Sequence, residues 1–264
     1  MNIKKITKIV FISLILVSFI FPSVSYSHGD AVSNLVSNES PETIRRFFLA
    51  NPALNINKVY PGGVTLLMFA AANNPHGSVI RLLVSLGANV NARDEAGLTP
   101  LIFAVTTNES LGVTFTLLQL GADPDLSDLE GVNALMYAAR DASPPIVETL
   151  LSRNPDVNKV AKNGWTPIMF AAASNSNVRV ADLLLEAGAQ INVTNSNGMT
   201  PLMLASKRAN NPEIVELLLR YSANTMIKTN GEMAIDFARR NPRLRNSSAL
   251  RNLETTTRLR RMES

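Results

Sequence analysis

The sequence has no cysteine and only two histidines, so several classes of active site lack their essential residues. The absence of cysteine among 264 residues excludes disulfide bonds, thiolate metal sites and a cysteine nucleophile. His28 and His76 alone are too few for a three-histidine metal site. The sequence also lacks the Gly-x-Ser-x-Gly, Gly-Lys-Ser/Thr and His-Glu-x-x-His motifs. These absences predict a chain that is not an enzyme, needs no cofactor and has no small-molecule substrate.

Aromatic residues are also scarce, and no apolar run is long enough to span a membrane as a helix. Aromatics make up 6% of the chain, whereas hydrophobic residues make up 46%, which excludes a disordered protein and predicts a core of small aliphatic side chains. The longest uncharged apolar run near the start is 13 residues, 9–21, short of the roughly 20 that a membrane-spanning helix requires.

The first 27 residues have the layout of a secretory signal peptide. Lys4, Lys5 and Lys8 precede the apolar run, and the small residues Ser25 and Ser27 are suitably spaced for cleavage before His28. We therefore expect an exported protein, either periplasmic or secreted. The alternative is that the leader stays attached and tethers a scaffold to the membrane.

A motif of Gly, any residue, a Thr-like residue and an apolar stretch recurs along the chain. The Thr-like positions are separated by 34, 34, 33, 34 and 33 residues and are Thr65, Thr99, Asn133, Thr166, Thr200 and Met233. A second apolar cluster with helical spacing follows each motif and runs into a Gly-Ala stop, as at Gly87-Ala88. A fixed period of this length indicates a stack of repeats.

The repeat resembles the ankyrin family in its Thr-Pro-Leu start, paired leucines and Gly-Ala-x-x-Asn stop, over roughly residues 30 to 240. The resemblance implies an all-α solenoid of stacked helix-turn-helix units joined by hairpin turns. We expect seven units: a degenerate N-terminal capping repeat at 28–58, repeats at 59–226, and a C-terminal capping repeat with an Arg-rich tail at 227–264.

One departure concerns the histidine that commonly follows Thr-Pro-Leu in the family. Apolar residues replace it here, namely Met68, Ile102, Met136, Met169 and Met203. We expect apolar contacts at these positions in place of histidine hydrogen bonds, because methionine adapts to irregular gaps.

The resemblance further implies that a monomeric chain binds another protein through its concave face, formed by hairpin tips and first helices. The residue before nearly every Thr-like position is apolar, which predicts an exposed row with Trp165 as its anchor; alternatively, these side chains pack on neighbouring hairpins. Other tip residues would supply specificity. The candidate partner-binding residues are Val64, Arg93, Glu95, Leu98, Leu129, Val132, Lys162, Trp165, Asn197, Met199 and Lys228.

Two other features allow more than one interpretation. Residues 239–264 hold eight arginines and two glutamates, a local net charge of +6, typical of a solvated cap or of a contact with anionic lipid or an acidic partner. Nucleic acid is disfavoured for an exported protein.

His28, if it becomes the N-terminus, could chelate copper. The acidic run 123–130 is not a calcium loop, since positions six and twelve are Asp128 and Ala134.

Overall fold

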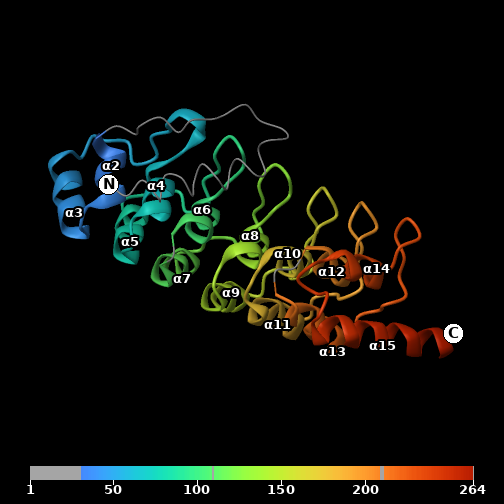
Figure 1. Cartoon of the computed structure of the whole chain (residues 1–264). Coiled ribbons are helices and arrows are strands. Elements are labelled where there is room, and N and C mark those ends of the chain that lie inside the picture. The colour runs from blue at the N-terminus through green and yellow to red at the C-terminus, as the bar shows by residue number, and fades with distance from the viewer. Residues whose placement is uncertain (1–30, 109, 209–210, 264) are drawn as a thin grey trace. The chain divides into compact units, whose positions relative to one another are not determined.

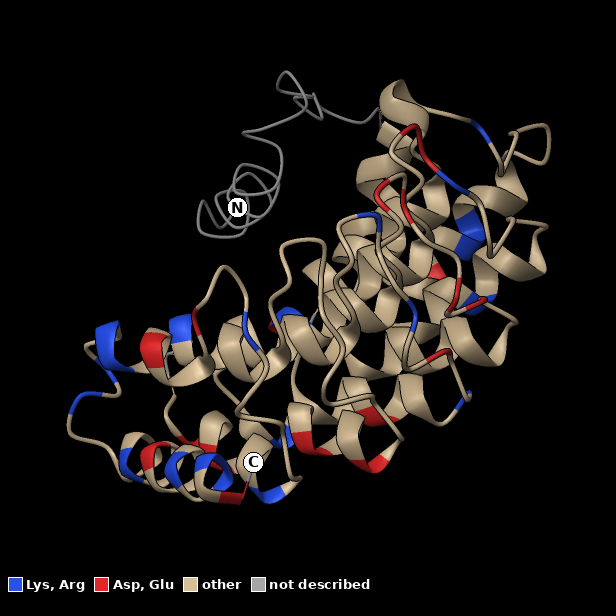
Figure 2. Cartoon of the chain, turned by 90° about the vertical axis from the view of Figure 1, so that its right-hand side faces the viewer, with Lys and Arg blue, Asp and Glu red and all other residues tan. Residues whose placement is uncertain are grey.

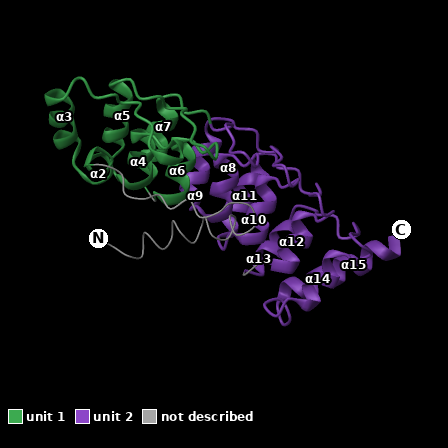
Figure 3. Ribbon diagram, turned by 90° about the horizontal axis from the view of Figure 1, so that it is seen from above, with its two compact units in different colours: residues 1–123 green, residues 124–264 purple. Residues whose placement is uncertain are grey.

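The computed structural model describes residues 31–108, 110–208 and 211–263 as helices joined by turns (Figure 1). The chain divides into two compact units, unit 1 at residues 1–123 and unit 2 at residues 124–264 (Figure 3). Among the described residues there is no β-strand, only isolated bridges in three hairpins, and no helix is long and apolar enough to cross a membrane. The predicted leader at 1–27 and His28 lie outside the described residues. The predicted all-α architecture is confirmed.

Unit 1 contains three helix pairs within its described part. The first helices of the pairs pack side by side in the order α2, α4, α6, and the second helices in the order α3, α5, α7. The elements are α2 (Ala31–Asn38), α3 (Pro41–Ala50), the 3-10 turn η1 (Pro61–Gly63), α4 (Leu66–Asn73), α5 (Gly77–Ser85), α6 (Pro100–Thr107) and α7 (Leu111–Gln119).

Unit 2 contains four helix pairs within its described part. Its first helices pack in the order α8, α10, α12, α14, and its second helices in the order α9, α11, α13, α15. The elements are α8 (Ala134–Asp141), α9 (Pro144–Leu151), α10 (Pro167–Ser174), α11 (Val178–Glu186), α12 (Pro201–Arg208), α13 (Glu213–Arg220), α14 (Ala234–Arg240) and α15 (Ser248–Glu263). The Arg-rich segment at the end of unit 2 is helical through Glu263, and the buried Leu253 anchors α15 in the core.

Four of the Thr-like residues of the repeat cap the first helices that follow them. Thr65, Thr99 and Thr200 each accept a hydrogen bond through Oγ1 from the backbone N–H three residues later, at 3.4, 3.3 and 3.2 Å. Asn133 does the same through Oδ1 at 3.0 Å. A side-chain acceptor at this position satisfies one of the backbone donors that a helix start leaves unpaired. The recurring residue therefore fixes where each of these helices begins.

The positions where the family commonly has histidine lie in the cores of the units. Met68, Met136 and Met169 are fully buried, and Ile102 and Met203 are nearly so. The sulfur of Met68 accepts the N–H of Thr65 at 3.4 Å, and that of Met203 accepts the N–H of Thr200 at 3.5 Å. The expected apolar packing at these positions is confirmed, and two of the sulfurs also serve as weak acceptors.

In several repeats an asparagine that follows the second helix ties neighbouring repeats together. In unit 1, Asn57 donates to the Gly87 carbonyl at 2.8 Å and accepts from the Asn89 N–H at 2.9 Å. In unit 2, Asn158 donates to the Gly188 carbonyl at 3.1 Å and accepts from the Gln190 N–H at 2.8 Å. Each side chain thus completes two backbone groups of the next repeat.

Replacing Asn158 with alanine should lower the unfolding free energy of unit 2 by about 1–3 kcal/mol, because two backbone groups lose their partner. Asn158→Asp keeps the acceptor and loses the donor, so its effect should be smaller. Trp165 is the only tryptophan, and urea unfolding followed by its fluorescence measures both variants. Equal stability of wild type and Asn158→Ala would contradict this role.

Candidate functional site

The hairpins that join the repeats hold the candidate binding residues, and several of these hairpins are closed by an acidic or amide side chain. Asp128 accepts the N–H groups of Glu130 and Val132 through Oδ1, both at 2.9 Å. Asn195 accepts those of Asn197 and Met199 at 3.0 Å in the equivalent turn. These bonds fix the direction of the hairpin tip relative to the first helix that follows.

Neighbouring hairpin tips are joined by backbone hydrogen bonds within each unit. In unit 1 the Glu95 N–H donates to the Gly62 carbonyl at 2.9 Å, and in unit 2 the Ser196 N–H donates to the Asn163 carbonyl at 3.1 Å. Gly164 permits this approach, since a Cβ on it would lie 2.6 Å from the Ser196 nitrogen. The tips of each unit therefore form a ridge held in register.

The expected exposed row of apolar tip residues is not present, which corrects the prediction. Val64, Val132 and Met199 are buried, at 2%, 8% and 7% exposure, and Leu98 and Trp165 are half-buried. Each precedes the capping residue of a first helix, a position whose side chain commonly packs on the fourth helical residue. The Trp165 and Phe170 rings show this contact, with centroids 4.9 Å apart.

The other predicted tip residues do reach the surface. In unit 1, Arg93 and Glu95 are exposed; in unit 2 the exposed ones are Leu129, Lys162, Asn197 and Lys228. A pocket in unit 2 brings together three of the predicted residues, Trp165, Asn197 and Met199. Val132 and the remaining predicted tip residues lie outside this pocket.

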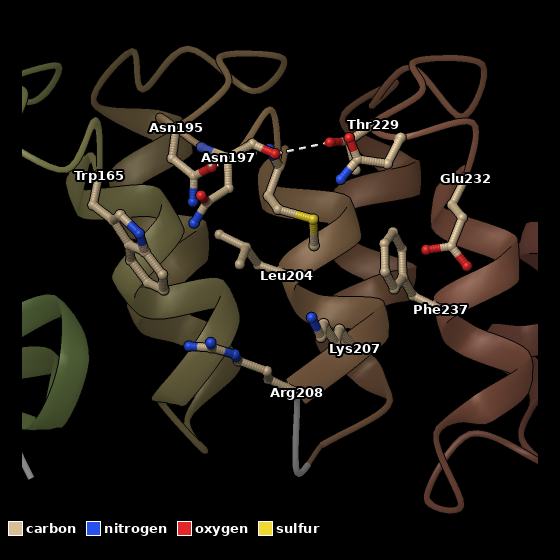
Figure 4. A pocket seen from close by; sticks show the side chains of 11 residues that line it. Trp165, Asn195, Asn197, Leu204, Lys207, Arg208, Thr229, Glu232 and Phe237 are labelled. Carbon is tan, nitrogen blue, oxygen red and sulfur yellow. Dashed lines mark hydrogen bonds between the residues drawn. The ribbon is translucent and has the colours of Figure 1, made fainter.

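The pocket has a volume of about 260 Å³ and is lined by residues of three hairpins and of the first helices α12 and α14 (Figure 4). Trp165 and Phe237 stand on opposite sides, with Leu204 between them. Asn195, Asn197 and Thr229 form the hairpin side, and Lys207 and Arg208 form the opposite side at the C-terminal end of α12. The remaining lining residues are Met199, Asn230 and Glu232.

Cationic side chains lie against both aromatic walls of the pocket. The Arg208 guanidinium carbon is 5.7 Å from the Trp165 ring centroid, and Lys207 Nζ is 5.5 Å from that of Phe237. Arg240 lies 5.1 Å from the Phe237 ring and is ion-paired with Glu232. Lys207 and Arg208 are exposed, and no described carboxylate is within ion-pair distance of either. The pocket therefore carries two positive charges without a countercharge.

Lys207, Arg208 and Phe237 were not among the residues predicted from the sequence. The pair of cations closing α12 was a usable signal, because the equivalent helix α10 ends without any charged residue. Two cations at a helix end also complement the helix dipole. Because that effect alone explains such a pair, the sequence does not indicate that they lie beside aromatic rings.

Perturbed carboxyls lie away from this pocket. Burial raises the pKa of Asp128 above 3.8, although hydrogen bonds from Tyr137 Oη at 2.7 Å and from two backbone N–H groups oppose the rise. Burial would also raise the pKa of Asp182, but hydrogen bonds from Tyr221 and Arg179 lower it overall. Among the described residues, no group of three or more His, Asp or Glu side chains could hold a metal ion.

The raised pKa of Asp128 predicts a pH-dependent stability. The folded state holds the proton more tightly than the unfolded chain, so ionised Asp128 costs stability at neutral pH, and this cost disappears as the pH falls through the raised pKa. Wild type should therefore gain stability relative to Asp128→Asn between pH 7 and pH 4, measured by urea unfolding at each pH. A relative loss over that range would contradict the sign of the shift.

Comparison with known proteins places the repeats in a known family. The model of ankyrin repeats (three copies) matches residues 30–128, 107–195 and 135–230. The human ASB11 ankyrin repeat domain superposes with a TM-score of 0.73 at 24% identity, covering 86% of this chain and 97% of that one.

A second solved structure is a complex of a predatory endopeptidase from Bdellovibrio bacteriovorus with an immunity protein. One chain of it superposes with a TM-score of 0.63 at 25% identity, covering 74% of this chain and 99% of that one. No curated protein sequence matches the chain significantly. The ankyrin fold is typically a scaffold for protein interaction. On the match across residues 30–230, this chain belongs to the ankyrin-repeat family.

Proposed function

We propose that this chain is an exported, monomeric, non-enzymatic module that binds another protein through the hairpins and first helices of unit 2. The observation that carries the proposal is the pocket between α12 and α14, where the only tryptophan forms one wall and two cations lack a carboxylate partner. Tryptophan and arginine are the residues most enriched among those that dominate binding energy at protein interfaces.

The Bdellovibrio complex supports this proposal. It is an assembly of two proteins, and the match extends over 99% of one of its chains. A similar chain therefore functions within a protein complex, which favours a protein partner here over a small ligand. The polar hairpin rim around an apolar floor is also the arrangement found in interfaces, where the centre is apolar and the edge is hydrated.

Replacing Trp165 with alanine should weaken partner binding by a factor of about 30 or more, since truncation of such an anchor costs about 2 kcal/mol or more. The measurement is affinity capture of a partner from the source cells, followed by titration of the purified pair. Phe115→Ala is the control, because Phe115 is an aromatic residue in α7 of unit 1 that is 48% exposed. A partner that binds both variants equally well would contradict binding at the pocket.

Export is supported by the leader, in which three lysines precede a 13-residue apolar run. We expect the protein recovered from the periplasm or medium to begin at His28, as determined by N-terminal sequencing. Recovery in the membrane fraction with an intact leader would favour the tethered scaffold, and recovery only in the cytoplasm would contradict export. A copper titration of the same protein tests whether a free His28 amine binds metal.

A further inference from the structure

We propose that the pocket of unit 2 binds an acidic peptide segment of the partner, one in which a carboxylate neighbours an aromatic or aliphatic side chain. The inference rests on the proposed function, and it specifies the chemistry that the pocket recognises. The carboxylate lies between Lys207 and Arg208, and the apolar neighbour contacts Leu204 and the exposed part of Trp165.

The charge at the pocket selects the carboxylate. Helix α12 ends in two consecutive cations, and the one acidic residue of the lining, Glu232, is already paired with Arg240. Lys207 and Arg208 extend from α12 into the pocket on the side opposite the hairpins (Figure 4). An arginine that lies over an indole ring is also held in place before it binds, so less side-chain entropy is lost on forming an ion pair.

The positive charge of the neighbouring helices also favours an acidic segment. Figure 2 shows that basic residues gather on the helices at the C-terminal end of unit 2. Residues 239–263 carry eight arginines and two glutamates, so the field around this end of the unit is positive. Such a field favours the approach of a negatively charged segment and increases its association rate.

The hairpin side of the pocket favours a peptide over a polyanion such as nucleic acid. Its lining is uncharged apart from Glu232, which is paired with Arg240, and it has exposed amides at Asn197 and Asn230 that carry both donor and acceptor atoms. Peptide backbone presents donors and acceptors in alternation and matches this side, whereas phosphates present only acceptors. A nucleic-acid surface would need a longer row of cations than the two found here.

The test is a selection from a random ten-residue peptide library displayed on phage, with the full chain as the target. We expect enriched sequences to contain Asp or Glu beside an aromatic or aliphatic residue. Because Trp165 is the only tryptophan, a synthetic copy of an enriched peptide should also change the emission of the protein on binding. Enrichment of basic or uncharged sequences would overturn the inference.

Charge reversal at the pocket supplies the decisive comparison. Lys207→Glu with Arg208→Glu should weaken binding of an enriched peptide, raising its dissociation constant about tenfold or more. Arg243→Glu with Arg245→Glu makes the same change in net charge at exposed residues outside the pocket, and should change it less than about threefold. The neutral pair Lys207→Gln with Arg208→Gln should give an intermediate loss, and urea unfolding verifies that each variant is folded.

The outcomes separate this inference from the proposed function. Peptides that depend on Trp165 but tolerate charge reversal at 207 and 208 would overturn the acidic chemistry and leave the binding function in place. Peptides that bind Trp165→Ala as well as wild type would overturn the pocket itself. A library that yields no more binders than an unrelated control protein would count against both.

Discussion

Leu253→Ala should destabilise unit 2 by about 2–5 kcal/mol, the range for removing a buried leucine side chain from a core that cannot close the gap. Leu253 is fully buried on α15, which packs against both α13 and α14. The variant should therefore loosen the last helix as well as create a cavity. Urea unfolding followed by Trp165 fluorescence measures the change.

Leu259→Ala on the same helix is the matched control, since Leu259 is 54% exposed. Its effect should stay within about 0.5 kcal/mol, as expected for a surface substitution. If the two variants were equally stable, α15 would not be a docked helix in solution. The Arg-rich end would then behave as a tail, as one interpretation of the sequence allowed.

Gly164→Ala should cost unit 2 about 2–5 kcal/mol, from two causes that add. The residue has a φ of +78°, which a Cβ disfavours by about 1–2 kcal/mol. The added Cβ would also lie 2.6 Å from the Ser196 nitrogen and 2.9 Å from the Asn195 Cα, so neighbouring hairpins would have to separate. Overpacking of this kind costs about 1–3 kcal/mol more.

Gly188→Ala isolates the first of these causes. Gly188 also has a positive φ, of +93°, but nothing lies within 4 Å of the position its Cβ would take. Its cost should be only the conformational part, about 1–2 kcal/mol. Equal costs for the two variants would show that hairpin contact at Gly164 does not constrain the unit. The same urea unfolding experiment compares them.

Much of the fold was predictable because its signals are local and repeated. The Thr-like positions mark where first helices begin, and three threonines and Asn133 make a capping bond there. The arginine-rich end was harder to predict. Its buried positions, Ala249, Leu253 and Thr257, are too few and too mixed in character for their helical spacing to stand out.

The site was only partly predictable, because exposure depends on contacts between repeats. Trp165 was identified from its position at a hairpin tip, and it does line the pocket. Val64 and Val132 occupy the same position in their repeats but are buried. Size explains the difference, since an indole ring can pack on Phe170 and still reach the surface. The roles of Lys207 and Arg208 depend on aromatic rings from two other repeats, which no local pattern reveals.

The composition of α10 has a consequence for how this protein must be handled before it folds. Every residue from Pro167 to Ala173 is apolar and buried, and the helix has no polar face along this stretch. A single repeat excised from the chain would therefore expose this apolar segment to water and aggregate. If the chain crosses a membrane unfolded, this stretch needs a chaperone until α8 and α12 cover it.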